Sequence, residues 1–314
     1  MTASNGQAGQ ADTAGQRWRG IFTIPVTPFR DDTELDLDSL RSEIDFCVEA
    51  GAAGIVHPVM ASEFFVLTDE ERFQMMPVVT RQVEQAGAKG RVPVVIGVAA
   101  TSTQGARRFA QAARDAGADA VIAMPPYVTK YSQDDVVRYF EAISDAAQLP
   151  IFVQNAGVAA MNVQTLLKLL REVEHVCYAK EEVAPAHHNI ARLVEAKEPK
   201  LRGVFGGGGG HNLIDELRRG GAGNMPAAQY TDVLQNIFNL WEQGKEAEAR
   251  ELHTRLMPAM NRERLAGGAS AKMVLVRRGV IKSARTRGAG GAIDDYDRAE
   301  MDALWPSISQ LFTW

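Results

Sequence analysis

Short apolar runs alternate along the chain with longer segments in which apolar residues recur every three or four positions, from about residue 21 onward. The short runs have the length and composition of buried strands, and the longer segments have the spacing of helices with one apolar face. Strands that alternate with helices predict a parallel sheet, because each helix carries the chain back to the start of the next strand.

Eight strands and the helices between them can be placed from this pattern. The expected strands are 21–26, 54–59, 92–98, 120–124, 150–153, 176–180, 201–205 and 222–225, and the clearest helices between them are 37–50, 69–85, 103–116, 133–147 and 163–172. Eight such units predict a closed (β/α)8 TIM barrel. A doubly wound sheet has fewer strands and a nucleotide-binding loop after the first, and Thr27-Pro28-Phe29 is no such loop.

The segments before the first strand and after the eighth strand define the expected domain organisation. Residues 1–19 are rich in Gly, Ala, Gln and Ser, and we expect them to form a disordered tail. Helical patterns at 246–262, 271–280 and 298–312 predict a C-terminal helical extension. The chain from 20 to 314 is therefore expected to be one domain, with the barrel at about 20–245 and the added helices at about 246–314.

Charge, hydropathy and the placement of Cys and His argue against several classes of protein. With a formal charge of −5, the chain has no basic field to attract nucleic acid, and no segment has the roughly 20 apolar residues of a membrane span. Cys47 and Cys177 lie far apart, and the adjacent His187 and His188 would face different sides of a helix. We therefore expect a cytoplasmic protein with no disulfide framework, no metal and no cofactor.

Lys180 is the first candidate for chemistry, because it lies inside the apolar strand pattern Val176-Cys177-Tyr178-Ala179-Lys180. Active sites of such barrels lie at the C-terminal ends of the strands. Desolvation there favours the neutral amine, which is the form that attacks a ketone. The pattern alone leaves a second interpretation open, in which the lysine reaches the strand end to pair with Glu181 or Glu182.

Three other strand ends carry polar candidates. Consecutive prolines end the fourth strand and fix the direction of Tyr127, which either relays protons or packs as an interfacial aromatic. Ala61, Ser62 and Glu63 follow the second strand, and they form either a substrate-binding loop or a helix cap with an acidic first turn. Asn155 ends the fifth strand.

Five consecutive glycines, 206–210, follow the seventh strand. Their backbone amides are suited to an anionic group, and Gly207 is a candidate substrate-binding position. A dinucleotide site is not indicated, because His211 stands where the third glycine of the GxGxxG pattern belongs.

In their order and spacing, these segments resemble the dihydrodipicolinate synthase and N-acetylneuraminate lyase superfamily of class I aldolases and dehydratases. The resemblance covers about residues 20–280. It rests on Thr27-Pro28-Phe29, Ser62-Glu63, Leu67-Thr68, Glu70-Glu71-Arg72, Met124-Pro125-Pro126-Tyr127, Asn155 and Lys180-Glu181. It implies that Lys180 forms a Schiff base with a 2-keto acid, that Tyr127 moves protons, and that the protein is a homotetramer or homodimer.

Departures from the superfamily pattern favour one branch. The usual GTTGE loop is here Val59-Met60-Ala61-Ser62-Glu63, without the threonine of the synthase, and Val158-Ala159-Ala160 stands where the synthase carries an arginine. The Ser-Glu pair, the Met-Pro-Pro-Tyr strand end and Val153-Gln154 are most similar to 2-keto-3-deoxyarabonate dehydratases.

Strand alternation places Glu182 on the same side as Lys180 and Glu181 on the opposite side. Glu182 and Ser62 are then candidate partners of the substrate C4 hydroxyl, and the backbone around Ala61 is a candidate site for its carboxylate. The predicted activity is dehydration of a 2-keto-3-deoxy sugar acid. Pyruvate-releasing cleavage, a dihydrodipicolinate synthase-like condensation and a non-catalytic keto-acid sensor remain as alternatives.

Overall fold

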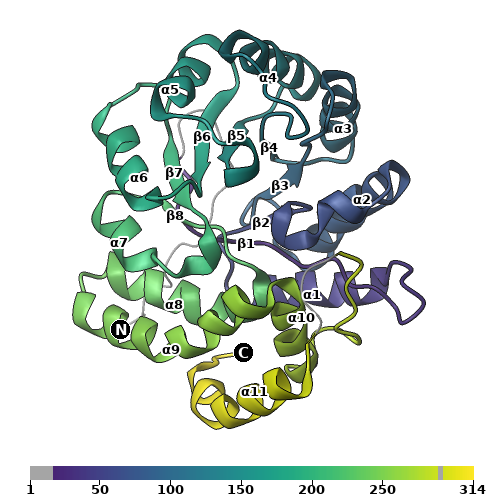
Figure 1. The fold of residues 1–314 in the computed structure, drawn as a ribbon, viewed down its shortest axis with the longest axis vertical. Helices are drawn as coiled ribbons and strands as arrows, with labels where there is room; N and C mark the ends of the chain where they lie inside the picture. Colours follow the sequence, from purple (N-terminus) through teal and green to yellow (C-terminus); the bar gives the residue numbers. More distant parts are fainter. Residues whose placement is uncertain (1–16, 289–292) are drawn as a thin grey trace.

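The computed structural model describes residues 17–288 and 293–314, and its centre is a closed barrel of parallel strands paired in the order β1 to β8 (Figure 1). The strands are β1 Gly20–Thr23, β2 Gly54–His57, β3 Val94–Gly97, β4 Ala120–Ala123, β5 Ile151–Asn155, β6 Val176–Glu181, β7 Gly203–Gly206 and β8 Gly223–Asn224. The predicted (β/α)8 barrel is thus confirmed. Most strands are shorter than the apolar runs that predicted them, because the ends of those runs pack as loops against the barrel.

Helices connect the strands and form the outer ring of the barrel (Figure 1). They are α1 Leu37–Glu49, α2 Asp69–Gln85, α3 Thr103–Asp115, α4 Gln133–Ala147, α5 Val163–Glu172, α6 Ala186–Glu195, α7 Leu213–Arg218 and α8 Thr231–Glu242. Capping residues explain where several of them begin. Thr68 forms a capping box with Glu71, and the side chains of Ser102, Ser132 and Asn162 accept hydrogen bonds from the first turns of their helices.

Aromatic side chains fill the barrel interior below the C-terminal ends of the strands. The rings of Phe152 and Tyr178 stack with centroids 4.4 Å apart, and Trp18 stacks on Tyr178 at 5.2 Å. The backbone amide of Trp18 also donates a hydrogen bond to the Tyr178 hydroxyl. The predicted tail, residues 1–19, thus includes Trp18, which is buried and packs as part of the barrel. The rest of that predicted tail, residues 1–16, lies outside the described residues.

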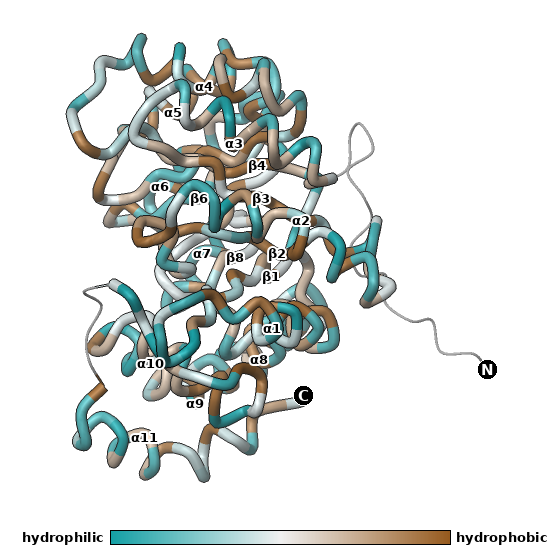
Figure 2. Tube along the Cα trace, turned by 90° about the vertical axis from the view of Figure 1, so that its right-hand side faces the viewer, coloured by the Kyte–Doolittle hydropathy of each residue, from teal (hydrophilic) through white to brown (hydrophobic). Residues whose placement is uncertain are grey.

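The C-terminal helical extension consists of α9 Glu246–Ala266, α10 Gly268–Arg277 and α11 Asp295–Ile308. Figures 1 and 2 both show these helices gathered on the side of the barrel where α1 and α8 lie. A buried ion pair ties the extension to the barrel, since Arg278 makes two hydrogen bonds to the carboxylate of Asp232 at the start of α8. The extension is thus packed on the barrel as part of one structure.

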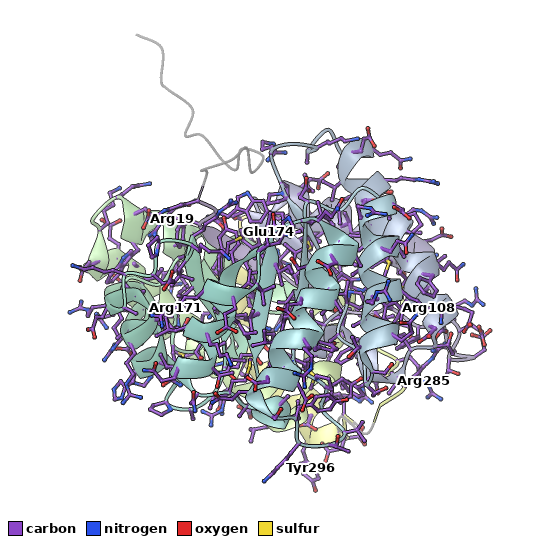
Figure 3. The ribbon with its side chains drawn as sticks, turned by 90° about the horizontal axis from the view of Figure 1, so that it is seen from above. Arg19, Arg108, Arg171, Glu174, Arg285 and Tyr296 are labelled. Carbon is purple, nitrogen blue, oxygen red and sulfur yellow. The ribbon has the colours of Figure 1, made fainter. Side chains whose placement is uncertain are left out.

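Charged side chains lie on the outside of the helical ring. Figure 3 shows Arg108 of α3 and Arg171 of α5 at the outer surface, and both are largely exposed. Among the described residues, no helix is long and apolar enough to cross a membrane.

Candidate active site

Lys180 lies near the C-terminal end of β6, and its side chain is only 4% exposed. The register pairs Lys180 with Gln154 of β5 and with Phe205 of β7. Phe205 belongs to the aromatic cluster inside the barrel, so Lys180 projects into the interior above that cluster. The aromatic floor and the strand register therefore place a buried amine at the mouth of the barrel, where enzymes with this fold carry out chemistry.

Glu182 forms an ion pair with the Lys180 ammonium. The same carboxylate oxygen accepts a hydrogen bond of 3.3 Å from the side-chain amide of Gln154. The Glu182 side chain is 20% exposed, so the pair lies at the boundary between the barrel interior and solvent. The predicted alternation is confirmed, and a carboxylate stands beside the amine.

The glycine run provides the space that Glu182 occupies. A Cβ atom on Gly207 would lie 2.1 Å from Cγ of Glu182, which is far inside the contact distance of two carbon atoms. On the outer side of the strand, a Cβ on Gly206 would lie 1.9 Å from the Glu216 carboxylate of α7. Two carboxyl groups thus pack against consecutive glycines, and side chains at these positions would displace them.

Glu216 is a buried carboxyl behind the site. Its carboxylate accepts a hydrogen bond of 2.7 Å from Asn224, which also donates to the Gly207 carbonyl. Burial raises the pKa of Glu216 to about 8; the bond from Asn224 opposes this, and the charge of Glu182 adds to it. Glu216 and Asn224 therefore hold the backbone of the glycine run from outside the barrel.

Tyr127 follows β4 and is partly buried at the rim. Its ring meets Phe64 edge to face at a centroid distance of 5.8 Å. Burial raises the pKa of the Tyr127 hydroxyl, while the nearby charge of Arg72 opposes that shift. Within the described part of the chain, no hydrogen bond joins Tyr127 directly to Lys180.

The loop after β2 is closed by its own hydrogen bonds. The Ser62 hydroxyl donates to the carbonyl of Pro25, and the Ser62 amide donates to the carbonyl of Val59. Ser62 is fully buried, whereas Ala61 is partly exposed. The contacts of Ser62 thus hold the loop in place, and Ala61 beside it remains partly exposed.

Glu63 faces the C-terminal extension. Its carboxylate pairs with Lys272 of α10 and accepts hydrogen bonds from the backbone amides of Arg287 and Gly288. The Lys272 ammonium also donates to the carbonyl of Arg285. These contacts join the second loop to the extension, and substrate binding by Glu63 stays a prediction.

Asn155 turns away from the barrel interior. Its side chain donates to the Glu181 carboxylate and to the carbonyl of Met161, and accepts a hydrogen bond from the amide of Met161. Because it is the residue next to Gln154, alternation directs it to the outer side of β5. These contacts hold the loop after β5, and the proposed substrate-binding set leaves Asn155 out.

A family model gives the decisive comparison. The model of the dihydrodipicolinate synthetase family matches residues 17–304, which is nearly the whole chain. The chain belongs to this family. The resemblance inferred from the sequence motifs is therefore confirmed, and the protein is a lyase of the dihydrodipicolinate synthetase family.

Individual family members differ in activity. The chain is 32% identical to L-2-keto-3-deoxyarabonate dehydratase of Azospirillum brasilense over 294 residues, which cover 92% of this chain and 94% of the relative. It is also 32% identical to 4-hydroxy-tetrahydrodipicolinate synthase of Bradyrhizobium diazoefficiens, over 79% of this chain and 82% of that enzyme. The crystal structure of dihydrodipicolinate synthase from Rhodopseudomonas palustris superimposes with a TM-score of 0.83 at 27% identity, covering 92% of this chain and 97% of that chain.

Three polar residues near the site were not predicted from the sequence as parts of it. Gln154 was noted only as a family feature, although the register opposite Lys180 would have identified it. Glu216 lies on a helix and Lys272 on the C-terminal extension of this family member, and both resemble ordinary surface charges in an amphipathic pattern. Only the packing of those helices brings Glu216 against β7 and Lys272 against the loop after β2.

The buried pair between Lys272 and Glu63 predicts a large effect on stability. We expect Lys272→Met to lower the free energy of unfolding by about 3–5 kcal/mol, because Glu63 would be left as an unpaired buried charge. Chemical denaturation of both proteins measures the difference. Lys89→Met, at an exposed pair with Glu84, is the control and should change stability by at most about 0.5 kcal/mol. Unchanged stability together with weaker substrate binding would instead favour a substrate-binding Glu63.

Proposed function

We propose that the protein is a dehydratase that forms a Schiff base between Lys180 and a 2-keto-3-deoxy sugar acid such as 2-keto-3-deoxyarabonate. The observation that carries the proposal is the ion pair of the buried Lys180 with the partly exposed Glu182 at the barrel mouth. An amine and a carboxylate in direct contact supply both a nucleophile and an acid, since proton transfer between them produces a neutral amine and a neutral carboxyl group.

The first half of the proposed cycle builds the Schiff base. Lys180 passes its proton to Glu182 and attacks C2 of the substrate, while the substrate carboxylate rests against the backbone at Ala61. Tyr127 moves the protons that convert the carbinolamine into an iminium ion with loss of water. The iminium withdraws electrons from C3, and Tyr127, deprotonated once the carbinolamine hydroxyl has left as water, takes a C3 proton and leaves an enamine.

The second half expels the C4 hydroxyl. The enamine electrons move to form the C3–C4 double bond and restore the iminium, the C4–O bond breaks, and Glu182 gives its proton to the departing hydroxyl. Water then hydrolyses the iminium, which releases an unsaturated keto acid of unchanged carbon count and regenerates Lys180. Gly207 contributes by leaving room for Glu182, and we infer no metal or cofactor in any step.

Two features favour dehydration over the alternatives. The match with the keto-deoxyarabonate dehydratase extends over 94% of that relative, whereas the synthase match covers 82% of its relative. The loop Gly157–Ala159, with Ala160 after it, carries no arginine, although the synthase pattern has one there for the substrate carboxylate. If a base instead deprotonates the C4 hydroxyl, the C3–C4 bond breaks and the enzyme is an aldolase.

A panel of 2-keto-3-deoxy sugar acids tests the proposal. Each acid is incubated with the enzyme, and loss of water and release of pyruvate are measured in parallel. We expect dehydration without pyruvate. Pyruvate and an aldehyde in equal amounts would identify an aldolase, and the absence of any borohydride-trapped adduct with pyruvate would favour a non-catalytic sensor.

Tyr127→Phe should retain the fold and lower the turnover rate about 10²-fold or more, which is the usual contribution of a general acid or base. The phenyl ring keeps the edge-to-face contact with Phe64, so the loss would come from the hydroxyl. Steady-state kinetics measure it, and thermal melting checks the fold. Unchanged activity would leave Tyr127 with a packing role only.

We infer a homotetramer or homodimer in the cytoplasm, and light scattering of the purified protein measures the assembly directly.

A further inference from the structure

A cavity of about 190 Å³ lies beside the barrel mouth, between the loop after β2, the end of β8 and the helices α9 and α10. Ala61 connects it to the site, because this residue lines the cavity and also packs against the interior aromatic cluster. Ala227, which also lines the cavity, lies two residues after Met225 of that same cluster. The cavity, called the side chamber below, therefore borders the upper face of the aromatic cluster on which Lys180 also lies. Its volume corresponds to about six water molecules, enough for a short hydroxylated segment but not for a whole sugar acid.

Glu263 of α9 is the carboxylate in this chamber that remains without a cation. Glu63, the other carboxylate in the wall, pairs with Lys272. Glu263 has no ion pair with any residue that the structure describes, and its contact is a hydrogen bond of 2.8 Å from the side-chain amide of Gln229. Burial raises the pKa of Glu263 to about 7, although the bond from Gln229 opposes the shift. An uncompensated carboxyl at a cavity wall is costly for stability and is typical of a binding role.

Gln229 adds a second unused acceptor behind Glu263. This side chain is only 2% exposed, and within the described ranges its Oε1 atom has no hydrogen-bond partner. A buried amide oxygen without a donor is uncommon in folded proteins. Of the two side chains Glu263 lines the cavity, and among the described residues its second carboxylate oxygen accepts no hydrogen bond, so a hydroxyl group could supply that donor.

The glycine run approaches both Glu182, which pairs with Lys180, and Glu263 of the cavity wall. Gly207 packs against Glu182, whereas a Cβ on Gly209 would lie 3.3 Å from a carboxylate oxygen of Glu263. The loop therefore passes from one carboxylate to the other without placing side chains between them. A substrate held at C2 by Lys180 can extend along this glycine surface, with its far end toward Glu263.

We propose that the chamber is the subsite for the far, hydroxyl-bearing end of the substrate, and that Glu263, held by Gln229, determines specificity by accepting a hydrogen bond from the terminal hydroxyl. This inference rests on the proposed function, because it assumes a keto acid bound at Lys180. It assigns a specificity role to the C-terminal extension, which supplies Glu263. It also gives a reason for the glycine run at 206–210, where side chains would lie between the two carboxylates.

Two substrates that differ only at the far end test the subsite. Kinetics are measured with 2-keto-3-deoxyarabonate and with 4-hydroxy-2-oxobutanoate, which keeps the C4 hydroxyl but lacks the terminal carbinol. We expect Glu263→Gln to lower kcat/KM for the five-carbon acid about 10-fold or more, the effect of weakening a hydrogen bond to a charged group. Values for the four-carbon acid should stay within about twofold. Glu251→Gln, at an exposed position on the same helix, is the matched control and should leave both substrates unaffected.

Borohydride trapping with pyruvate separates the two proposals. Pyruvate has no far end, so Glu263→Gln should trap it at the wild-type rate, and this also shows that the variant is folded. Equal losses with both substrates, or an unchanged kcat/KM for the five-carbon acid, would overturn the subsite while the trapped adduct leaves the proposed function standing. A wild-type protein that traps no pyruvate and turns over neither acid would instead refute the proposed function.

Discussion

Replacing Lys180 by alanine is expected to abolish turnover, with a loss of at least about 10³-fold, and to abolish the borohydride-trapped adduct with pyruvate. The reason is chemical, because the proposed cycle has no other amine that can attack C2. Mass spectrometry of the reduced wild-type protein should place the adduct on Lys180. An adduct on another residue would refute the assignment directly.

Two further variants separate chemistry from stability in this experiment. Lys180→Arg keeps a cation beside Glu182 but offers no nucleophilic amine, so it should remain folded and inactive. Lys130→Ala changes an exposed residue in the loop after β4, and it should lower the rate far less. Comparable losses from Lys180→Ala and Lys130→Ala would mean that the reactive amine has been misassigned.

The barrel could be predicted because its signals are local. Each apolar run is bounded by turn residues, and helices α2, α4 and α5 begin at capping residues that the sequence displays directly. Trp18 was missed because a single aromatic in a polar tail carries no periodicity, and only closure of the barrel gives it neighbours.

The candidate site could be predicted only where alternation along one strand decides the geometry. Lys180, Glu182 and Glu181 follow from that rule, and their contacts agree with it. Asn155 and Glu63 were expected at the substrate, but each is engaged by a partner whose position depends on tertiary packing. The rule for parallel strands fixes which residues share a face; it does not reveal which helix or loop will cover an outward-facing side chain.

Glu182 links the reaction type to the geometry of the site. It contacts the Lys180 ammonium and accepts a hydrogen bond from Gln154, and Gly207 leaves the space in which it lies. A carboxylate in this position can take the lysine proton before the attack and return a proton to the C4 hydroxyl afterwards. When Glu182 is replaced, water at this solvent boundary can still take the lysine proton, whereas the proposed cycle has no other acid for the leaving C4 hydroxyl, so a variant that cannot exchange protons should separate the two events.

Glu182→Gln should still allow the Schiff base to form but should slow the loss of water by at least about 10³-fold, within the range of a general acid contribution. The amide is nearly isosteric and keeps the contact with the glycine run, but it cannot deliver a proton to the leaving hydroxyl. Borohydride should therefore trap the intact substrate on Lys180, with the mass of the keto acid before dehydration. The matched control is Glu181→Gln, which changes a carboxylate on the outer side of β6 that does not face Lys180. If Glu182→Gln dehydrates the substrate at the wild-type rate, or if the wild-type enzyme releases pyruvate and an aldehyde, the acid role of Glu182 is refuted.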